Sequence, residues 1–339
     1  MERCLLGMSL AQAFADPFAD EPAAEKDDWR VKRYAKLVMG PLLLGYLSWL
    51  TVKLGDGWAD GVLFAARDGY LPCEFYQAIQ KKFPEWNLPP GMYFYTNRRT
   101  AFLPNAAESG SDQAVIGLVE HLKLSLSPEK LLLEFFDLPA QAVWPPASEN
   151  VDLREYIAMH AVAIAEQARK ARMAYYRYMD NLGLRMGGRY VFMDFVATGT
   201  CQMYLEQFAP FELKGLYFGR TMYDRGYDIA VETYLRGEFP ELLENYMELE
   251  SYMTSLEPSL QRFDEDGRPQ LAEELRTKRM MDDIQTMHQA VREYVYTFLR
   301  LFWWERGEID PALPEQMYAI NKGGDIYREN YDDWAQCSL

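Results

Sequence analysis

Three short polar segments of this sequence carry residue types that can act on an anionic or hydroxylated ligand. They are Arg67-Asp68-Gly69-Tyr70, Thr96-Asn97-Arg98-Arg99, and Asp194 to Thr200. Arginine forks bind phosphate or carboxylate groups in bidentate fashion, and aspartates bind metal ions or sugar hydroxyls. This combination predicts a polar, anion-binding site.

The segment from Asp194 to Gln202 combines a carboxylate, two hydroxyls and a glycine between a predicted strand and a predicted helix. Such a turn can present backbone amides, with Thr198, Gly199, Thr200 and Gln202 around them, to a phosphate group. Asp194 would then hold a metal ion or a sugar hydroxyl. The alternative is an ordinary helix start, because threonine is a normal N-cap residue.

The first segment places Arg67 and Asp68 beside Gly69. A glycine has no side chain, so a ligand could approach the backbone closely there. The two opposite charges could instead pair with each other, but we favour a functional role because the apolar strand before them ends in charge. We predict Asp68 and Asp194 as the catalytic carboxylates, and as the ligands of Mg²⁺ if a metal is bound.

The second segment offers Arg98 and Arg99 next to Thr96. Both arginines are predicted to bind phosphate, although one of two adjacent arginines is expected to point to solvent. Thr96 would add a hydroxyl to the site. Arg220 follows a later predicted strand and could bring a further cation to the same rim.

Short apolar runs must position these segments. Strands are predicted near residues 61–66, 92–95, 189–194 and 213–218, with helical patterns between and after them. Strands that alternate with helices indicate a parallel sheet, in which ligands bind at the carboxyl ends of the strands. We therefore predict an α/β fold with a Rossmann-like three-layer parallel sheet, a large helical insertion and a helical C-terminal part.

The chain divides by composition and pattern into five consecutive parts. We expect a lead-in segment, a first part of the α/β core, a helical insertion, a second part of the core and a mainly helical C-terminal part, at residues 1–27, 28–101, 102–186, 187–235 and 236–339. The polar segments all lie in the two core parts. The glutamates Glu244, Glu248 and Glu250 are expected to form a solvated helix face, although one of them could face the site.

Composition places the chain among globular proteins, with 49% hydrophobic and 25% charged residues in 339. The formal net charge of −16 argues against a nucleic-acid partner, because phosphate backbones would be repelled at long range. A small anionic ligand is still compatible with this charge, since a few arginines can make a local positive pocket.

Cellular placement follows from cysteine spacing and apolar runs. Cys4, Cys73, Cys201 and Cys337 lie far apart and form no zinc or disulfide pattern, which favours reduced thiols in the cytoplasm. The apolar run 36–52 is interrupted by Gly40-Pro41 and is too short to span a bilayer comfortably. We expect it to be a buried helix, kinked at the proline.

The runs GVLFAARDGYL, YFYTNRRTA and YVFMDFVATGTCQ together resemble an uncharacterised domain of bacterial surface-polysaccharide biosynthesis proteins, which often follows a haloacid-dehalogenase-like (HAD-like) hydrolase domain. Its members end three strands in S/A-R-D-G-Y, S-R-R-A and D-x-G-x-x-G-T/S-x-Q. The resemblance extends from about Leu37 to Phe298. It implies a role in glycan or sugar-phosphate metabolism, and a glycosyltransferase or a HAD-like protein as a partner.

Two further resemblances concern single motifs. The first segment is similar to the D-x-D-G-T-L motif of HAD phosphatases, but Ala66 stands where the nucleophilic aspartate belongs. A degenerate protein of that kind would bind phosphate without forming an aspartyl-phosphate. Asp194 to Thr200 is similar to the phosphate loop of phosphoribosyltransferases, although this chain has one acid where that family usually has two.

These observations lead to one main prediction and an alternative of another class. We expect the protein to bind, and to turn over if it is an enzyme, a phosphorylated sugar or nucleotide-sugar in bacterial glycan metabolism. The alternative is a non-enzymatic scaffold that docks a partner protein or a second copy of itself. Convergence of Asp68, Arg98 and Asp194 in one place would favour the ligand site.

Overall fold

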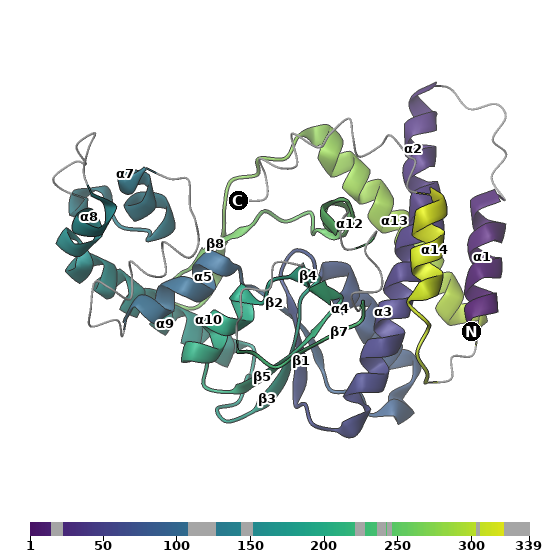
Figure 1. The fold of residues 1–339 in the computed structure, drawn as a ribbon, viewed down its shortest axis with the longest axis horizontal. Helices are drawn as coiled ribbons and strands as arrows, with labels where there is room; N and C mark the ends of the chain where they lie inside the picture. Colours follow the sequence, from purple (N-terminus) through teal and green to yellow (C-terminus); the bar gives the residue numbers. More distant parts are fainter. Residues whose placement is uncertain are drawn as a thin grey trace.

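The computed structural model describes residues 1–14, 23–107, 127–143, 152–220, 228–235, 242, 246–302 and 306–321. Within these ranges a parallel β-sheet of five strands has helices packed on both faces (Figure 1). The predicted α/β fold, with a Rossmann-like sheet and additional helical parts, is confirmed.

All neighbouring strands of the sheet run parallel, in the order β2-β1-β3-β5-β7. The strands are β1 (Gly61–Ala65), β2 (Gly91–Phe94), β3 (Arg189–Met193), β5 (Glu212–Tyr217) and β7 (Val231–Thr233). The first four match the predicted strands within about a residue at each end. The strand β7 was not predicted, because its three residues, Val-Glu-Thr, contain no apolar run.

Alternate residues of the central strands face two different cores, as the period of a strand requires. In β1, Val62 and Phe64 belong to one core, whereas Leu63 and Ala65 belong to the other. Because both faces are buried, the strand reads as a continuous apolar run instead of an alternating one. This explains why the sequence revealed the central strands clearly.

The two faces of the sheet are covered by different parts of the chain. One core contains residues of α1 (Glu2–Phe14), α2 (Ala23–Tyr34), α3 (Gly40–Lys53), α4 (Tyr70–Lys82), α12 (Tyr246–Met253), α13 (Lys278–Leu301) and α14 (Ala312–Asn321). The other contains residues of α5 (Arg98–Phe102), α8 (Leu153–Met159), α9 (Ala161–Asn181) and α10 (Thr200–Phe208). The short helix α7 (Pro128–Lys130) begins with Ser127 as its N-cap.

The apolar N-terminal run is a buried helix, as expected. The π-helical turn Ala35–Met39 joins α2 to α3 directly before Pro41, where the helix lacks a backbone amide donor. Residues 29–56 are long and apolar enough to cross a membrane, but 89% of their most apolar window is buried inside the protein. Such burial is compatible with the core helix of a soluble protein.

The C-terminal part is mainly helical, as predicted, but it also contains a β-hairpin. Residues Leu260–Phe263 form β8 and Pro269–Leu271 form β9, which pair as an antiparallel hairpin. The difference from a wholly helical part is that α13 begins only after Thr277, whose side chain accepts a hydrogen bond from the amide of Met280. The turn Asp264 to Gly267 between the strands explains the difference, because an Asp-Gly-rich turn favours a hairpin.

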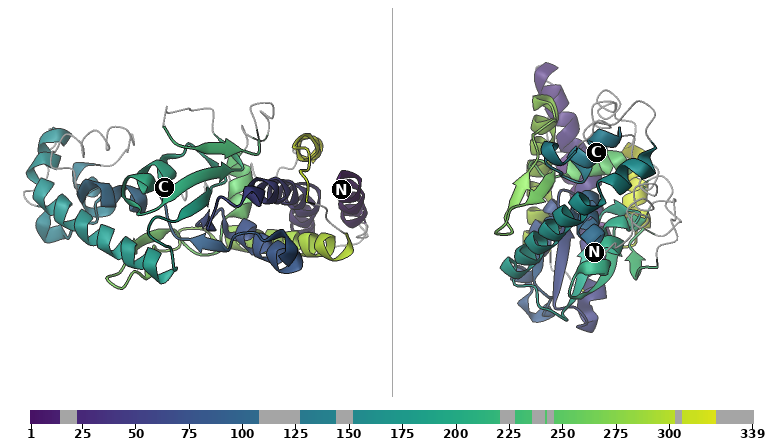
Figure 2. Two further views of the ribbon diagram at one scale, coloured as in Figure 1. Left: turned by 90° about the horizontal axis from the view of Figure 1, so that it is seen from below. Right: turned by 90° about the vertical axis from the view of Figure 1, so that its left-hand side faces the viewer.

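The elements are arranged along one long axis. The helices of the insertion lie at one end and α1, α2 and α14 at the other, with the sheet between them (Figures 1 and 2). The hairpin β8–β9 runs from the sheet toward the insertion. The C-terminal part therefore contacts both halves of the molecule.

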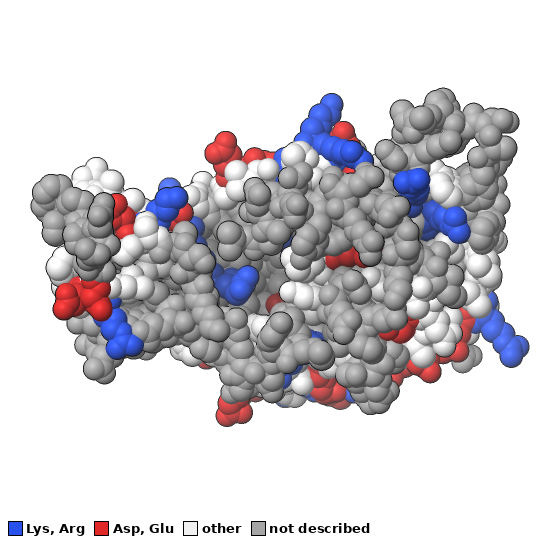
Figure 3. All heavy atoms as spheres, turned by 45° about the horizontal axis from the view of Figure 1, so that its top comes forward, with Lys and Arg blue, Asp and Glu red and all other residues white. Residues whose placement is uncertain are grey.

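Basic and acidic side chains are mixed on the surface. On the face drawn in Figure 3, Lys and Arg side chains are interspersed with Asp and Glu side chains among the described residues. Of the cysteines that the structure describes, Cys4, Cys73 and Cys201 are free thiols, while Cys337 lies outside the described residues. The absence of a disulfide in the described part agrees with the spacing of the cysteines.

Candidate functional site

The carboxyl ends of β1 and β3 are the topological switch point of the sheet. After β1 the chain continues into α4, which packs in one core, and after β3 it continues into α10, which packs in the other. Neighbouring strands whose following helices leave to opposite faces leave a gap between them, and open α/β sheets bind ligands there. Asp68 follows β1 and Asp194 follows β3, so both lie at this gap.

The two aspartates interact electrostatically in the folded protein. Burial raises the pKa of Asp68 to about 7, Arg67 acts to lower it, and the Asp194 carboxylate raises it further. Burial likewise raises the pKa of Asp194 to about 6, although the amide of Phe195 and the Arg98 guanidinium act in the opposite direction. Both residues keep part of their surface exposed. The two carboxyl groups are therefore largely surrounded by protein, while both residues keep some solvent-accessible surface.

A third carboxylate, Glu250 of α12, completes the group. Its pKa is raised well above the usual value by burial and by the charges of Asp68 and Asp194. The positive charges of Arg67 and Arg98 act to lower the pKa of Glu250. We refer to Arg67, Asp68, Arg98, Asp194 and Glu250 as the strand-end cluster.

The expected solvated helix face of glutamates is wrong for two of its members. Glu250 faces the strand-end cluster, and the carboxylate of Glu248 accepts a hydrogen bond from the Tyr318 hydroxyl at 3.3 Å. Glu244 lies outside the described residues. No local pattern reveals the role of Glu250, because only the packing of α12 beside the strand ends brings it to Asp68.

Arg67 has an unusual backbone conformation and a fixed side chain. Its φ of 73° is in the left-handed region, which is costly for a residue with a β-carbon. Its amide donates to the Tyr93 hydroxyl at 2.8 Å, and its guanidinium donates to Thr254 Oγ1 at 3.1 Å and Ser259 Oγ at 2.9 Å. The Arg67 carbonyl accepts from the amide of Ser255 at 3.1 Å. Arg67 thus joins the end of β1 to the segment 254–260.

The segment 254–260 is in turn held by a buried arginine. The Arg276 guanidinium donates to the carbonyl oxygens of Ser255, Leu256 and Glu257 at 2.7, 3.2 and 3.0 Å. It also forms an ion pair with Glu274 at 2.6 Å. Because one rigid fork fixes three successive carbonyls, this wall of the site is preorganised.

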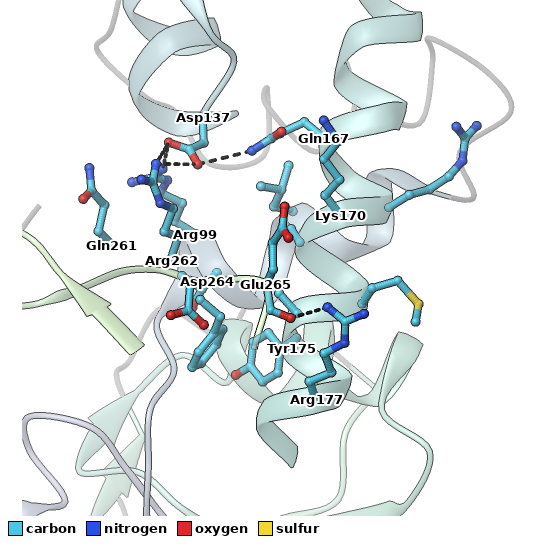
Figure 4. A pocket seen from close by; sticks show the side chains of 17 residues that line it. Arg99, Asp137, Gln167, Lys170, Tyr175, Arg177, Gln261, Arg262, Asp264 and Glu265 are labelled. Carbon is cyan, nitrogen blue, oxygen red and sulfur yellow. Dashed lines mark hydrogen bonds and ion pairs between the residues drawn. The ribbon is translucent and has the colours of Figure 1, made fainter. Parts of the chain in front are cut away.

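The adjacent arginines Arg98 and Arg99 point to different places. Arg98 is exposed, and its positive charge acts to lower the pKa values of Asp194 and Glu250. Arg99 instead donates to the carbonyl of Phe135 at 3.0 Å and lies 3.6 Å from a carboxylate oxygen of Asp137, in a separate pocket (Figure 4). The structure therefore brings Arg98 to the strand-end cluster and places Arg99 elsewhere.

Thr96 is buried beneath this rim. Its hydroxyl lies 3.4 Å from the thiol of Cys201, at the start of α10. Asn97 caps α5 by accepting a hydrogen bond from the amide of Thr100. These contacts explain the polar residues after β2 as local structure that orients Arg98.

The loop before α10 has the backbone expected of a tight strand-to-helix turn. Gly199 adopts a φ of +88°, and a β-carbon there would lie 2.3 Å from the Ile229 side chain. The hydroxyls of Thr198 and Thr200 lie 2.7 Å apart and share a hydrogen bond. Arg220 is opposite Ala197 in the pairing of β4 (Val196–Ala197) with β6 (Gly219–Arg220), so it borders this loop.

Gln202 and Gly69 have structural roles. The fully buried Gln202 side chain donates to Glu206 and to the carbonyl of Ala230, and accepts from the Tyr217 hydroxyl at 2.7 Å. Gly69 is required because a β-carbon would lie 2.4 Å from the Ala65 carbonyl oxygen. The space at Gly69 is thus filled by β1 itself and not by a ligand.

Behind the site, the helix α13 is attached to the first turn of α4. Arg292 forms hydrogen bonds of 2.8 to 3.0 Å with the Glu74 carboxylate, and its guanidinium lies over the ring of Tyr70. The ring of Tyr70 stacks on the buried His288 at 5.7 Å. These contacts support the turn that carries Asp68, and His288 also lies against the backbone of Tyr252 and Thr254.

The donor set at the strand ends suits Mg²⁺ in type, because carboxylate oxygens are its usual protein ligands. Among the residues that the structure describes, no group of three or more His, Cys, Asp or Glu side chains converges closely enough to hold a metal ion. A Mg²⁺ ion between Asp68 and Asp194 would need further ligands from water or substrate, which is common for this metal. The metal therefore stays a prediction.

A scan against protein-family models finds no match to this chain, and a search of curated proteins finds no significantly similar sequence. The geometry of the strand-end cluster is consequently the basis for a proposed function.

Proposed function

We propose that the strand-end cluster binds a phosphorylated sugar or a nucleotide-sugar. The observation that carries this proposal is the meeting of three carboxylates and two arginines at the gap between β1 and β3. Sugar hydroxyls donate hydrogen bonds to carboxylates, and phosphate groups accept them from arginines. A ligand with both kinds of group matches both halves of the cluster.

The state of the carboxylates supports a ligand in this place. Within the described part of the chain, the carboxylates of Asp68 and Glu250 accept no hydrogen bond from a protein group. Burying such a group without partners costs free energy, and a ligand hydroxyl or a metal ion would remove that cost. We infer that the folded protein retains this free-energy cost because the unpaired carboxylates bind a ligand.

The raised pKa values also give the site the means for acid-base chemistry. A carboxyl group that titrates near neutral pH can both accept and donate a proton at working pH. Two carboxyl groups at one site, such as Asp68 and Asp194, can divide the roles of acid and base when a bound ligand makes their environments differ. If the protein is an enzyme, we expect transfer or hydrolysis at the phosphate or glycosidic bond of its ligand.

The ligand is tested by thermal unfolding with and without Mg²⁺ in the presence of nucleotide-sugars, sugar phosphates and phosphoribosyl pyrophosphate. A ligand at about 100 times its Kd stabilises the folded state by about 2.7 kcal/mol, which raises Tm by about 2 to 4 °C. We expect Asp194→Asn to abolish the shift. The exposed Asp282 on α13 provides a matched control, since Asp282→Asn removes the same charge from a residue outside the strand-end cluster.

The result separates the proposal from its alternative. A shift with one ligand class that is lost in Asp194→Asn and kept in Asp282→Asn supports the strand-end site. Absence of a shift with every phosphate compound contradicts it and favours a scaffold that docks a partner protein. A shift with phosphoribosyl pyrophosphate alone would favour the phosphoribosyltransferase-like function.

A further inference from the structure

A separate pocket of about 630 Å³ lies between α9, the residues after β2 and the hairpin β8–β9 (Figure 4). We call it the basic pocket. Its volume is within the range of small-molecule sites. Arg99 reaches it from α5, Lys170 from α9 and Arg262 from β8, so three distant parts of the sequence build it.

The charge of the basic pocket is opposite to that of the whole protein. Five of its lining residues are basic and three are acidic, in a chain whose formal net charge is −16. The basic residues are Arg99, Arg169, Lys170, Arg177 and Arg262, and the acidic residues are Asp137, Asp264 and Glu265. This local surplus of positive charge favours the binding of an anion.

The three acidic residues neutralise this surplus only in part, although the Glu265 side chain also points into the pocket (Figure 4). The Asp137 carboxylate forms ion pairs with two guanidinium groups, that of Arg99 at 3.6 Å and that of Arg262 at 3.4 Å. Asp264 is occupied by backbone amides of the hairpin turn. Lys170 makes no hydrogen bond or ion pair with any group in the described ranges, and its side chain borders the pocket (Figure 4).

The walls of the basic pocket are fixed before any ligand binds. The ring of Phe263 stacks on Tyr178 of α9 at 4.4 Å, and Asn181 donates to the carbonyl of Asp266 at 2.9 Å. At Gly267 the hairpin turn approaches α9 so closely that a β-carbon would lie 2.4 Å from the amide of Tyr178. Preorganised walls lower the cost of ordering on binding.

We propose that the basic pocket binds a small organic molecule with two or more negative charges, either a phosphate ester or a polycarboxylate. Lys170 and the pair Arg99 and Arg262 bind the charged groups. The apolar surface of Met173 and Phe263, which also line the pocket, contacts the remainder of the ligand. This site is distinct from the strand-end cluster, and the proposal does not depend on the function proposed for that cluster.

Isothermal titration calorimetry of the full chain with ADP, pyrophosphate and citrate tests the proposal. We expect at least one of these probes to bind with a Kd below about 1 mM at low salt. Lys170→Ala and Arg262→Ala should each weaken binding about tenfold, because each removes a hydrogen bond to a charged group. The exposed Lys81 on α4 is the matched control, and Lys81→Ala should leave Kd unchanged.

The probes separate the two sources of charge. Binding of ADP or pyrophosphate without citrate assigns a phosphate ester, and binding of citrate without the others assigns a polycarboxylate. The proposal is overturned if none of the three binds, or if Lys170→Ala and Arg262→Ala both leave Kd unchanged. It is also overturned if Asp194→Asn abolishes binding that the two pocket variants preserve, because the probe then occupies the strand-end cluster.

Discussion

The Asp68 carboxyl group costs the folded protein free energy when it ionises. Its pKa rises from a usual value of 3.8 to about 7, so folding favours the protonated form. The stability of the protein therefore declines as pH rises from about 4 to about 7. Proteins keep such costs at sites where binding or catalysis needs the charged group.

Asp68→Asn should accordingly stabilise the protein without ligand at pH 8, by about 1 to 3 kcal/mol. The gain should be smaller at pH 5, because the wild-type carboxyl is then mostly protonated in the folded state and pays less of this cost. Urea unfolding of both proteins at the two pH values measures the difference. A loss of stability at pH 8 would show that the carboxylate has a stabilising partner.

Arg67 combines a stabilising side chain with an unfavourable backbone conformation, and two substitutions separate these effects. Arg67→Ala loses the hydrogen bonds to Thr254 and Ser259 and keeps the cost of its positive φ. Arg67→Gly loses the same bonds but accepts that φ freely. We expect the glycine variant to be about 1 kcal/mol more stable than the alanine variant in urea unfolding. Equal stabilities would mean that the φ of Arg67 carries no cost.

At the scale of elements, the sequence was sufficient to predict the α/β fold and four of the five strands of the described sheet. The strands β1 and β3 are buried on both faces, so continuous apolar runs revealed them, and the polar residues after them marked the site. A parallel sheet brings such strand ends together, which is why Asp68, Arg98 and Asp194 could be predicted to meet. The charges of these three residues do interact in the structure.

What the sequence could not reveal depends on contacts between distant segments. Glu250 joins the site only because α12 packs beside the strand ends, and Arg99 leaves it because Asp137 lies in another pocket. Gln202 belongs to a motif of the predicted phosphate loop, yet its amide is used inside the core. Local spacing contains no information about these partners.

The docking of the hairpin β8–β9 on α9 can be tested at its closest point. Gly267→Ala combines a positive φ with a severe clash against the backbone of Tyr178. Gly183→Ala is a matched control, because Gly183 also has a positive φ, of +75°, but open space around it. We expect the control to lose about 1 kcal/mol and Gly267→Ala to lose clearly more in urea unfolding.

Hydrogen exchange gives a second readout of the same pair of variants. Amides in the hairpin and in the second half of α9 should exchange faster in Gly267→Ala and remain protected in Gly183→Ala. Equal protection in the two variants would mean that the hairpin does not depend on this close approach.

At the scale of the whole molecule, the formal net charge of −16 should make stability depend on salt. Like charges repel one another in the compact state, and salt screens them over about 10 Å at 0.1 M. We expect Tm to rise when NaCl is increased from about 0.05 to about 0.5 M, in a range where surface charges are progressively screened. A fall in Tm would mean that favourable ion pairs, such as those of Glu232 with Lys53 and Lys214, outweigh the repulsion.

The position of the segment 254–260 has a consequence for protein synthesis. Chains emerge from the ribosome with the N-terminal part first, so Asp68, Arg98 and Asp194 are available well before Glu250 and Arg276. A nascent chain that has completed β5 still lacks the wall that holds Arg67 in place. The strand-end cluster thus lacks Glu250 until α12 has been synthesised, and the wall that holds Arg67 is complete only when translation has passed Arg276.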